Sequence, residues 1–150
     1  MTGCEIIGNF HVHTEHSDGT GSLACVAQAA QRAGLDVVMA TDHNTCVADA
    51  EGWHTNSQTG QRVLLLTGQE VHDPALSPPG NHYLALGVEQ PVHQHATQPQ
   101  TLVDAVERAG GLGFIAHPFE VPAPLIGVPA FPWRAWEVNG FAGIELWNYL

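Results

Sequence analysis

Residues 23–43, LACVAQAAQRAGLDVVMATDH, decide the fold, because they read in succession as a helix, a glycine stop and a buried strand. The apolar spacing predicts the helix over residues 23–33, and Ser22 can cap its first turn. Gly34 suits the C-terminal end, since glycine adopts a left-handed backbone without strain. The strand predicted over residues 36–43 has an apolar run at residues 37–40 and ends in aspartate and histidine.

A second unit in the same order follows later in the chain. We predict a helix over residues 102–109, capped by Thr101 and stopped by Gly110, and then a strand over residues 112–117 that again ends in histidine. Two serial helix–strand units favour an α/β architecture with a parallel sheet.

The remaining segments complete this outline of a single domain. Further strands are predicted over residues 6–13, 62–70, 82–88 and 142–148. Residues 118–138 are rich in proline and aromatic residues and predict a long loop, with one helical turn near residues 133–138. Residues 89–100 predict a second, polar loop. At 150 residues and 44% hydrophobic content, the chain can form one packed core.

The charge balance limits the classes of partner. The formal net charge is -11, from 15 acidic residues against four arginines and no lysine. A nucleic-acid surface needs a basic face, so we expect no nucleic-acid partner. No apolar run reaches the length of a membrane span, and no signal peptide is visible. Three cysteines, Cys4, Cys25 and Cys46, form no CxxC pair, so we expect a reduced, cytoplasmic protein.

Metal-competent side chains stand at the predicted ends of several strands. They are His11 and His13, then Asp42 and His43, then Glu70, and finally His117. Carboxyl ends of parallel strands share one face of a β/α barrel, so these side chains should converge. His11 and His13 are two apart on a strand and point to the same side. Imidazole with carboxylate suits zinc, manganese or iron better than calcium or magnesium, and Glu70 could bridge two ions.

Each motif has a structural alternative. The two strand histidines could only pack or cap, the Asp42-His43-Asn44 segment could be a turn, and Glu70 could pair with an arginine. His117 could be a buried, hydrogen-bonded histidine. Apolar strands seldom end repeatedly in ionisable groups without a functional reason, so the combination favours a metal site.

These motifs, in this order, resemble the PHP (polymerase and histidinol phosphatase) family, in its stand-alone phosphoesterase-like branch. His11-Val12-His13-Thr14 with Ser17-Asp18-Gly19 resembles the HxHTxxSDG opening, and Thr41-Asp42-His43-Asn44 resembles the TDHN segment. Gly68-Gln69-Glu70, His82 before Leu84-Ala85-Leu86-Gly87, His117-Pro118 and Gly143-Ile144-Glu145 with Asn148 resemble the later segments. The resemblance implies a partial, distorted (β/α)7-type PHP barrel.

The resemblance also implies a site with two or three divalent ions (zinc, manganese or iron). His11 and His13 would hold the first ion, Glu70 would bridge it to a second on His82 and His117, and Asp18 and His43 would hold a third. A metal-bound hydroxide would attack phosphorus, so no side-chain nucleophile is assigned. Glu145 and Asn148 would support the ligands or line the pocket, or would only be polar groups at a strand end.

The other histidines, His16, His54, His72, His93 and His95, match no motif position, and we predict that they lie on the surface. Cys46 is expected to be inert rather than a ligand. Trp133, Trp136 and Trp147 could line a ring-binding pocket, but core packing is expected for most of them.

The resemblance covers the first part of the family barrel. Later strands of that barrel supply an Asp-x-His pair, and none follows Asn148 here. We therefore expect residues 1–150 to be a PHP metallohydrolase domain that is incomplete at its C-terminus, either as a fragment or truncated product or as a chain completed by another subunit. The oligomeric state cannot be read from the sequence.

The expected function is a phosphoesterase that releases phosphate from a small phosphate ester. One alternative is a non-phosphate metallohydrolase acting on a carbamate or ester, since some relatives in this branch cleave carbamate-type esters. A second alternative is a metal-binding accessory domain without catalysis.

Overall fold

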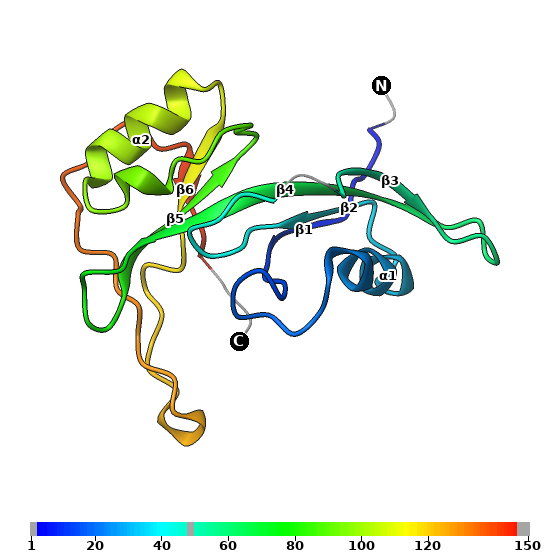
Figure 1. The fold of residues 1–150 in the computed structure, drawn as a ribbon, viewed down its shortest axis with the longest axis horizontal. Coiled ribbons are helices and arrows are strands. Elements are labelled where there is room, and N and C mark those ends of the chain that lie inside the picture. The colour runs from blue at the N-terminus through cyan, green and yellow to red at the C-terminus, as the bar shows by residue number, and fades with distance from the viewer. Residues whose placement is uncertain (1–2, 48–49, 147–150) are drawn as a thin grey trace.

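The computed structural model describes residues 3–47 and 50–146 of the chain. In chain order, the elements are β1 (Gly8–Val12), α1 (Leu23–Ala33), β2 (Val37–Ala40), β3 (Gly52–Thr55), β4 (Arg62–Asp73), β5 (Gly80–Leu86), α2 (Pro99–Arg108), β6 (Leu112–Ile115) and β7 (Gly143–Ile144) (Figure 1). Short 3-10 helices lie at His93–His95 and Pro124–Ile126. No helix in these two described ranges is long and apolar enough to cross a bilayer.

The strands form one mixed sheet rather than the parallel sheet that we predicted. Its order is β1-β2-β4-β5-β6-β7, with β3 paired to β4 outside this path. The pairs β1–β2, β2–β4 and β6–β7 are parallel, whereas β4–β5 and β5–β6 are antiparallel. Only the short segment 74–79 joins β4 to β5, and so short a connection reverses the chain instead of crossing over. The prediction of a parallel sheet therefore holds for β1–β2, β2–β4 and β6–β7 and was wrong for the strands that pair with β5.

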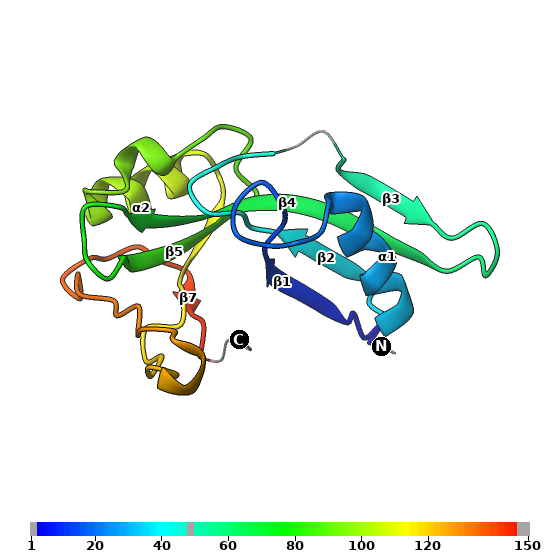
Figure 2. The ribbon, with the colours of Figure 1, turned by 60° about the horizontal axis from the view of Figure 1, so that its bottom comes forward.

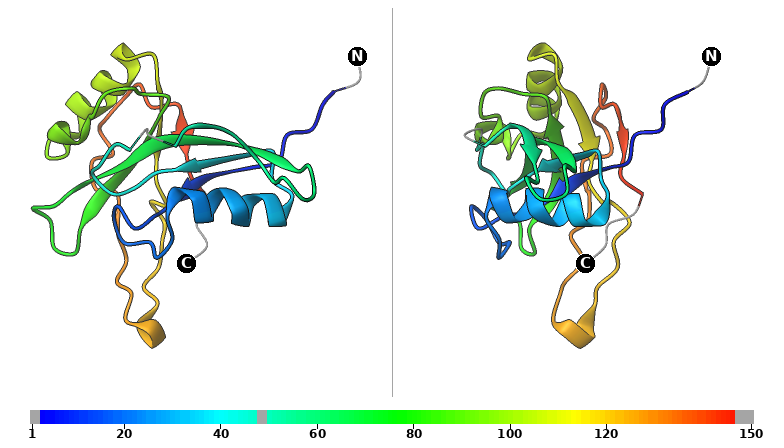
Figure 3. Two further views of the ribbon diagram at one scale, coloured as in Figure 1. Left: turned by 45° about the vertical axis from the view of Figure 1, so that its right-hand side comes forward. Right: turned by 90° about the vertical axis from the view of Figure 1, so that its right-hand side faces the viewer.

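Strand β4 runs along the longest dimension of the molecule and joins its two halves (Figures 1 and 2). Its first half pairs with β2 and β3, and its second half pairs with β5. Helix α1 packs on β2 and β4 through Ala27 and Ala30, while α2 packs on β5 and β6 through Leu102 and Val106. The mixed α/β sheet curls into a half-barrel (Figure 3).

The helix ends follow local sequence in one helix and depart from it in the other. The Ser22 side chain accepts a hydrogen bond from the Cys25 amide, and Gly34 has φ 75°, as predicted. Helix α2 begins earlier than predicted, at Pro99, which suits the first helical position because it has no amide proton to leave unpaired. Thr101 thus lies inside the helix and is not its cap.

No helix forms over residues 133–138; the segment holds a single hydrogen-bonded turn, in which the Val138 amide donates to the Ala135 carbonyl oxygen at 3.3 Å. The 118–131 stretch instead projects from the body as a hairpin-like loop (Figure 3), with Ala123 bridged to Val128. Trp133 is buried as predicted, but Trp136 is half exposed and stacks on Phe119. Of the strand predicted over residues 142–148, Gly143–Ile144 pairs with β6. Trp147 and Asn148 lie outside the described residues.

Candidate metal centre

The buried carboxylate of Glu70 is the centre of a histidine cluster. Among the described residues, five imidazoles place a ring nitrogen within 3.2 Å of its two oxygens. Oε2 faces His11 Nε2 at 3.1 Å, His13 Nε2 at 3.2 Å and His43 Nδ1 at 3.1 Å. Oε1 faces His82 Nδ1 and His117 Nε2, both at 2.9 Å. The carboxylate therefore has two sides, each surrounded by nitrogen donors.

The mixed sheet explains how these side chains meet. Strands β1 and β2 run parallel to β4, so His11, His13 and His43 come from or follow carboxyl ends that lie beside Glu70. Because β5 runs in the opposite direction, His82 reaches the same place from near its amino end. Glu70 itself lies within β4, which continues to Asp73, so the prediction of a strand ending at Glu70 was wrong.

Asp18 extends the cluster toward solvent. Its carboxylate lies 3.5 Å from His13 Nδ1 and 3.6 Å from His43 Nε2, and its side chain is 68% exposed. The structure thus brings all seven predicted ligand candidates into one region, with Asp18 at its rim. Ligand atoms fall into overlapping groups of three that lie within 4.8 Å of one another, among them His11–His13–Glu70, Glu70–His82–His117 and His13–Asp18–His43.

The donor set fits divalent cations. His11 Nε2 and His13 Nε2 lie 3.1 Å apart, and both also face Glu70 Oε2. Two imidazole lone pairs and a carboxylate aimed at one point repel one another unless a proton or a cation lies between them. Nitrogen and carboxylate donors in this mixture are those that zinc, manganese and iron accept.

In the metal-free protein, a proton on the His11 ring balances the negative charge of the Glu70 carboxylate. Burial alone would raise the pKa of Glu70, but hydrogen bonds from His11, His117, His13 and His82 hold it well below its usual value. Burial alone would lower the pKa of His11, but its contacts with Glu145 and Glu70 raise it to about 10. His11 and Glu70 are therefore held as an ion pair that a metal would replace.

Asp42 organises the loop after β1 instead of facing the cluster. Its buried carboxylate accepts hydrogen bonds from the Thr14 amide at 2.7 Å, the Thr14 hydroxyl at 2.6 Å and the Ser17 hydroxyl at 2.6 Å. In the same loop, a Cβ added to Gly19 would lie 2.4 Å from the His13 carbonyl oxygen. The TDHN and SDG motifs thus hold the backbone that carries His13 and Asp18.

Two further carboxylates lie behind the cluster histidines, and one of them, Glu145, is hydrogen-bonded to them. Glu145 Oε1 lies 2.9 Å from His11 Nδ1, and Glu145 Oε2 accepts a hydrogen bond from the His117 amide at 3.1 Å. Glu120 Oε2 faces His117 Nδ1 at 3.5 Å, and neither atom has a hydrogen-bond partner among the described residues. A carboxylate behind a histidine fixes which ring nitrogen keeps its lone pair for a metal.

His72 was predicted to lie on the surface; it is partly exposed, but it belongs to the same region as the cluster. Its ring stacks on His82 with centroids 4.9 Å apart, and its Nδ1 lies 3.2 Å from His43 Nδ1. Burial and the neighbouring His82 and His43 lower the pKa of His72 to about 4, so the ring is neutral at pH 7. The available signal was the spacing of Glu70 and His72, two apart on one strand like His11 and His13.

The remaining histidines lie away from the cluster. His16 is exposed, His54 contacts the Ala50 carbonyl oxygen at 2.7 Å, and His93 and His95 belong to a 3-10 helix. His54, His93 and His95 are partly rather than fully exposed. Cys46 is partly buried and joins none of the ligand groups found among the described residues.

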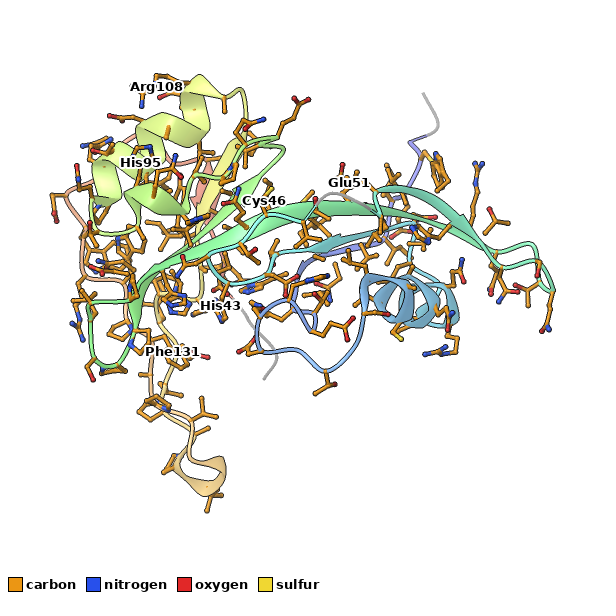
Figure 4. The ribbon with its side chains drawn as sticks, viewed as in Figure 1. His43, Cys46, Glu51, His95, Arg108 and Phe131 are labelled. Carbon is orange, nitrogen blue, oxygen red and sulfur yellow. The ribbon has the colours of Figure 1, made fainter. Side chains whose placement is uncertain are left out.

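A pocket opens over the cluster, with an apolar wall beside the polar floor. Val12, Pro79 and Phe131 line it together with the histidines, and the Phe131 ring lies 5.2 Å from that of His82. Figure 4 shows His43 and Phe131 together below β4, and Arg108 far from them on α2. Of the described residues that line this pocket, none is an arginine.

Comparison with known proteins supports the fold alone. No protein-family model matches the sequence, and no curated protein matches it. A solved structure from Bacteroides vulgatus ATCC 8482 is similar, with a TM-score of 0.54 and 23% sequence identity over 85% of this chain. It is described as a two-domain protein containing a predicted PHP-like metal-dependent phosphoesterase. The present chain spans 39% of that chain's length, and the likeness is one of architecture.

Proposed function

We propose that the chain is part of a metal-dependent hydrolase, and that its substrate is a small phosphate ester. The observation that carries this proposal is the buried Glu70 carboxylate with five imidazole nitrogens within 3.2 Å of its oxygens. We further infer that residues 1–150 belong to a PHP-type domain and that the curled sheet is part of a barrel of that type. The order of the sequence motifs and the architecture of the Bacteroides neighbour support this inference.

The two sides of Glu70 suggest how its neighbours share the ions. We assign one ion to His11 and His13 with Glu70 Oε2, and another to His82 and His117 with Glu70 Oε1. Asp18 and His43 would hold a third. Zinc, manganese or iron bound in this way would act as a Lewis acid, lowering the pKa of bound water and stabilising charge on phosphoryl oxygens.

The protein's own residues orient these ligands. Glu145 contacts His11 Nδ1 and leaves His11 Nε2 directed at the centre, while its other oxygen fixes the amide of His117. Asp42 holds the loop through Thr14 and Ser17, so His13 and Asp18 keep their positions without a ligand. Preorganised ligands of this kind favour binding because little reorganisation remains to be done.

The test is a turnover assay on the purified protein loaded with manganese, zinc or iron. p-Nitrophenyl phosphate and nucleoside monophosphates serve as substrates, and Glu70→Gln serves as the matched loss-of-site variant. We expect metal-dependent release of phosphate that Glu70→Gln abolishes. Absence of turnover with every metal, in protein shown by elemental analysis to contain metal, would sink the phosphoesterase assignment and leave the metal site standing.

A second candidate is the hydrolysis of an uncharged carbamate or carboxylic ester. It is favoured by the lack of an arginine among the described pocket-lining residues and by the apolar wall of Val12, Pro79 and Phe131. A dianionic phosphate ester would meet positive charge only from the ions, whereas a neutral ester needs none. Turnover of p-nitrophenyl acetate or a carbamate, with inorganic phosphate acting only as an inhibitor, would favour this second candidate.

A further inference from the structure

We propose that His72 is an additional metal-binding side chain, which forms with His43 and His82 an all-imidazole site for a zinc-type transition-metal ion. This inference rests on the proposed metal centre and adds a ligand that the sequence motifs do not contain. The three side chains each offer a ring nitrogen, and these nitrogens lie within 4.8 Å of one another.

The position of His72 follows from the alternation of β4. Side chains two apart on a strand point to the same face, so His72 faces the side on which Glu70 meets the histidine cluster. His72 lines the pocket over the cluster together with His43 and His82.

The contacts of the His72 ring are those of a ligand more than of a packing residue. Its Nδ1 lies 3.2 Å from His43 Nδ1, and its ring stacks on His82 at an interplanar angle of 21°. Two Nδ1 atoms at this distance need one proton between them, and only one of the two rings can supply it. A divalent cation would use both lone pairs at once.

The backbone that carries His72 and the backbone that carries His82 are both held in place without a metal ion. Asn44 clamps His72 at two points: its side-chain amide donates to the His72 carbonyl oxygen at 3.1 Å, and its side-chain oxygen accepts from the His72 amide at 3.0 Å. Across the ladder, the β4–β5 register shifts between Val71 and Asp73, opposite Asn81, which has φ 56°. Such bulges re-aim side chains, and here the affected neighbour is His82.

The rings of His43 and His82 can each serve one ion at a time, because a neutral imidazole has a single free lone pair. An ion on His43, His72 and His82 therefore takes His43 away from Asp18, and it leaves the ion beside Glu70 Oε1 to Glu70 and His117. His43 Nε2 faces the exposed Asp18 carboxylate at 3.6 Å, whereas its Nδ1 lies 3.1 Å from Glu70 and 3.2 Å from His72. The shorter contacts and the deeper burial favour the His72 side. Nitrogen-only donors favour zinc over manganese, which prefers oxygen ligands.

The test is the number of zinc ions per chain, measured by elemental analysis after equilibration with free Zn²⁺ and removal of excess metal. His72→Ala should bind about one ion fewer than the wild-type protein. The matched control His95→Ala, on a partly exposed histidine outside the cluster, should bind as many as wild type. Equal zinc content in folded His72→Ala and wild-type protein would overturn the proposal.

A second measurement on the unaltered protein guards against a variant that does not fold. Zinc titration of ¹⁵N-histidine-labelled protein should move the His72 Nδ1 resonance to the metal-bound range, with His72→Gln used for assignment. An unchanged His72 resonance at full zinc occupancy would overturn the proposal. If the wild-type protein bound no metal at all, the proposed function itself would fail, which is a different outcome from loss of this one ligand.

Discussion

His11 Nδ1 lies 2.9 Å from Glu145 Oε1, although 134 positions separate the two residues in the chain. The contact joins the first strand of the sheet to the segment just after β7, and it fixes the ring of a proposed metal ligand. Removing this carboxylate should free the ring to turn and to lose its preferred tautomer. We predict that Glu145→Ala lowers zinc affinity by about 10–100-fold, the usual effect of losing a carboxylate behind a ligand histidine.

Isothermal titration with Zn²⁺ checks this prediction, and Glu137→Ala is the matched control because Glu137 is an exposed acid on the surface. Glu145→Gln should restore part of the affinity, since its side-chain oxygen can still accept a hydrogen bond. A folded Glu145→Ala protein with unchanged zinc affinity would show that Glu145 does not orient the ligand.

Asp42→Ala should destabilise the fold by about 2–4 kcal/mol, because three donors from Thr14 and Ser17 would lose their buried acceptor. Thermal unfolding of the metal-free protein measures the change. A loss below about 0.5 kcal/mol would mean that these hydrogen bonds do not hold the loop.

The same carboxylate gives stability a pH dependence. Burial acts to raise the pKa of Asp42, but hydrogen bonds from Ser17 and Thr14 lower it overall. A lowered folded-state pKa means that the stabilisation is present above about pH 4, the ordinary value of aspartate, and is lost as pH falls toward the folded value. Unfolding of wild type and Asp42→Asn between pH 6 and pH 3 should therefore converge at the acid end.

Zinc binding should release protons at pH 7.5. The pKa of His11 is about 10 in the metal-free protein, so its ring carries a proton that zinc must displace. Calorimetric titrations in two buffers with different ionisation enthalpies give the number released, which we expect to be about one or more. Identical apparent enthalpies in both buffers would contradict the ion pair between His11 and Glu70.

Gly19→Ala should lower zinc affinity more markedly than it lowers the melting temperature. The added Cβ would lie 2.4 Å from the His13 carbonyl oxygen and displace the loop beside Asp18. Gly21→Ala is the control in the same loop, since its Cβ would meet only the Cys25 Cβ at 3.3 Å. Zinc affinity and melting temperature of both variants test this difference. Equal zinc affinity for the two would count against a positioning role for the loop.

The sequence predicts correctly those features of the fold that depend on interactions within one turn of the chain. Ser22 and Gly34 bound α1 because a hydroxyl and a flexible backbone act within one turn. Thr101 failed as a cap because Pro99, which fits the first helical turn, starts α2 earlier. Strand direction was also missed, since it depends on how β5 returns beside β4 and not on any single segment.

In the candidate site too, the sequence predicts what local spacing decides and misses what the tertiary arrangement decides. His11 and His13 could be paired by strand alternation alone, and family motifs supplied His82, which lies near the amino end of an antiparallel strand. His72 was assigned to the surface because no motif contains it, although alternation from Glu70 already placed it on the same face. The position of Glu120, whose Oε2 lies 3.5 Å from His117 Nδ1, has no sequence signal, since only the loop after His117 brings the two together.

The most direct test of the central claim is the metal content of wild-type protein and of Glu70→Gln, measured by elemental analysis after equilibration with Zn²⁺ or Mn²⁺. Glu70 is the carboxylate around which five imidazoles gather among the described residues, so it should hold the ions together. We predict about two or more ions per chain in wild type and a clear loss in folded Glu70→Gln. Fewer than about one ion per wild-type chain, or an unchanged content in the variant, would contradict the metal centre.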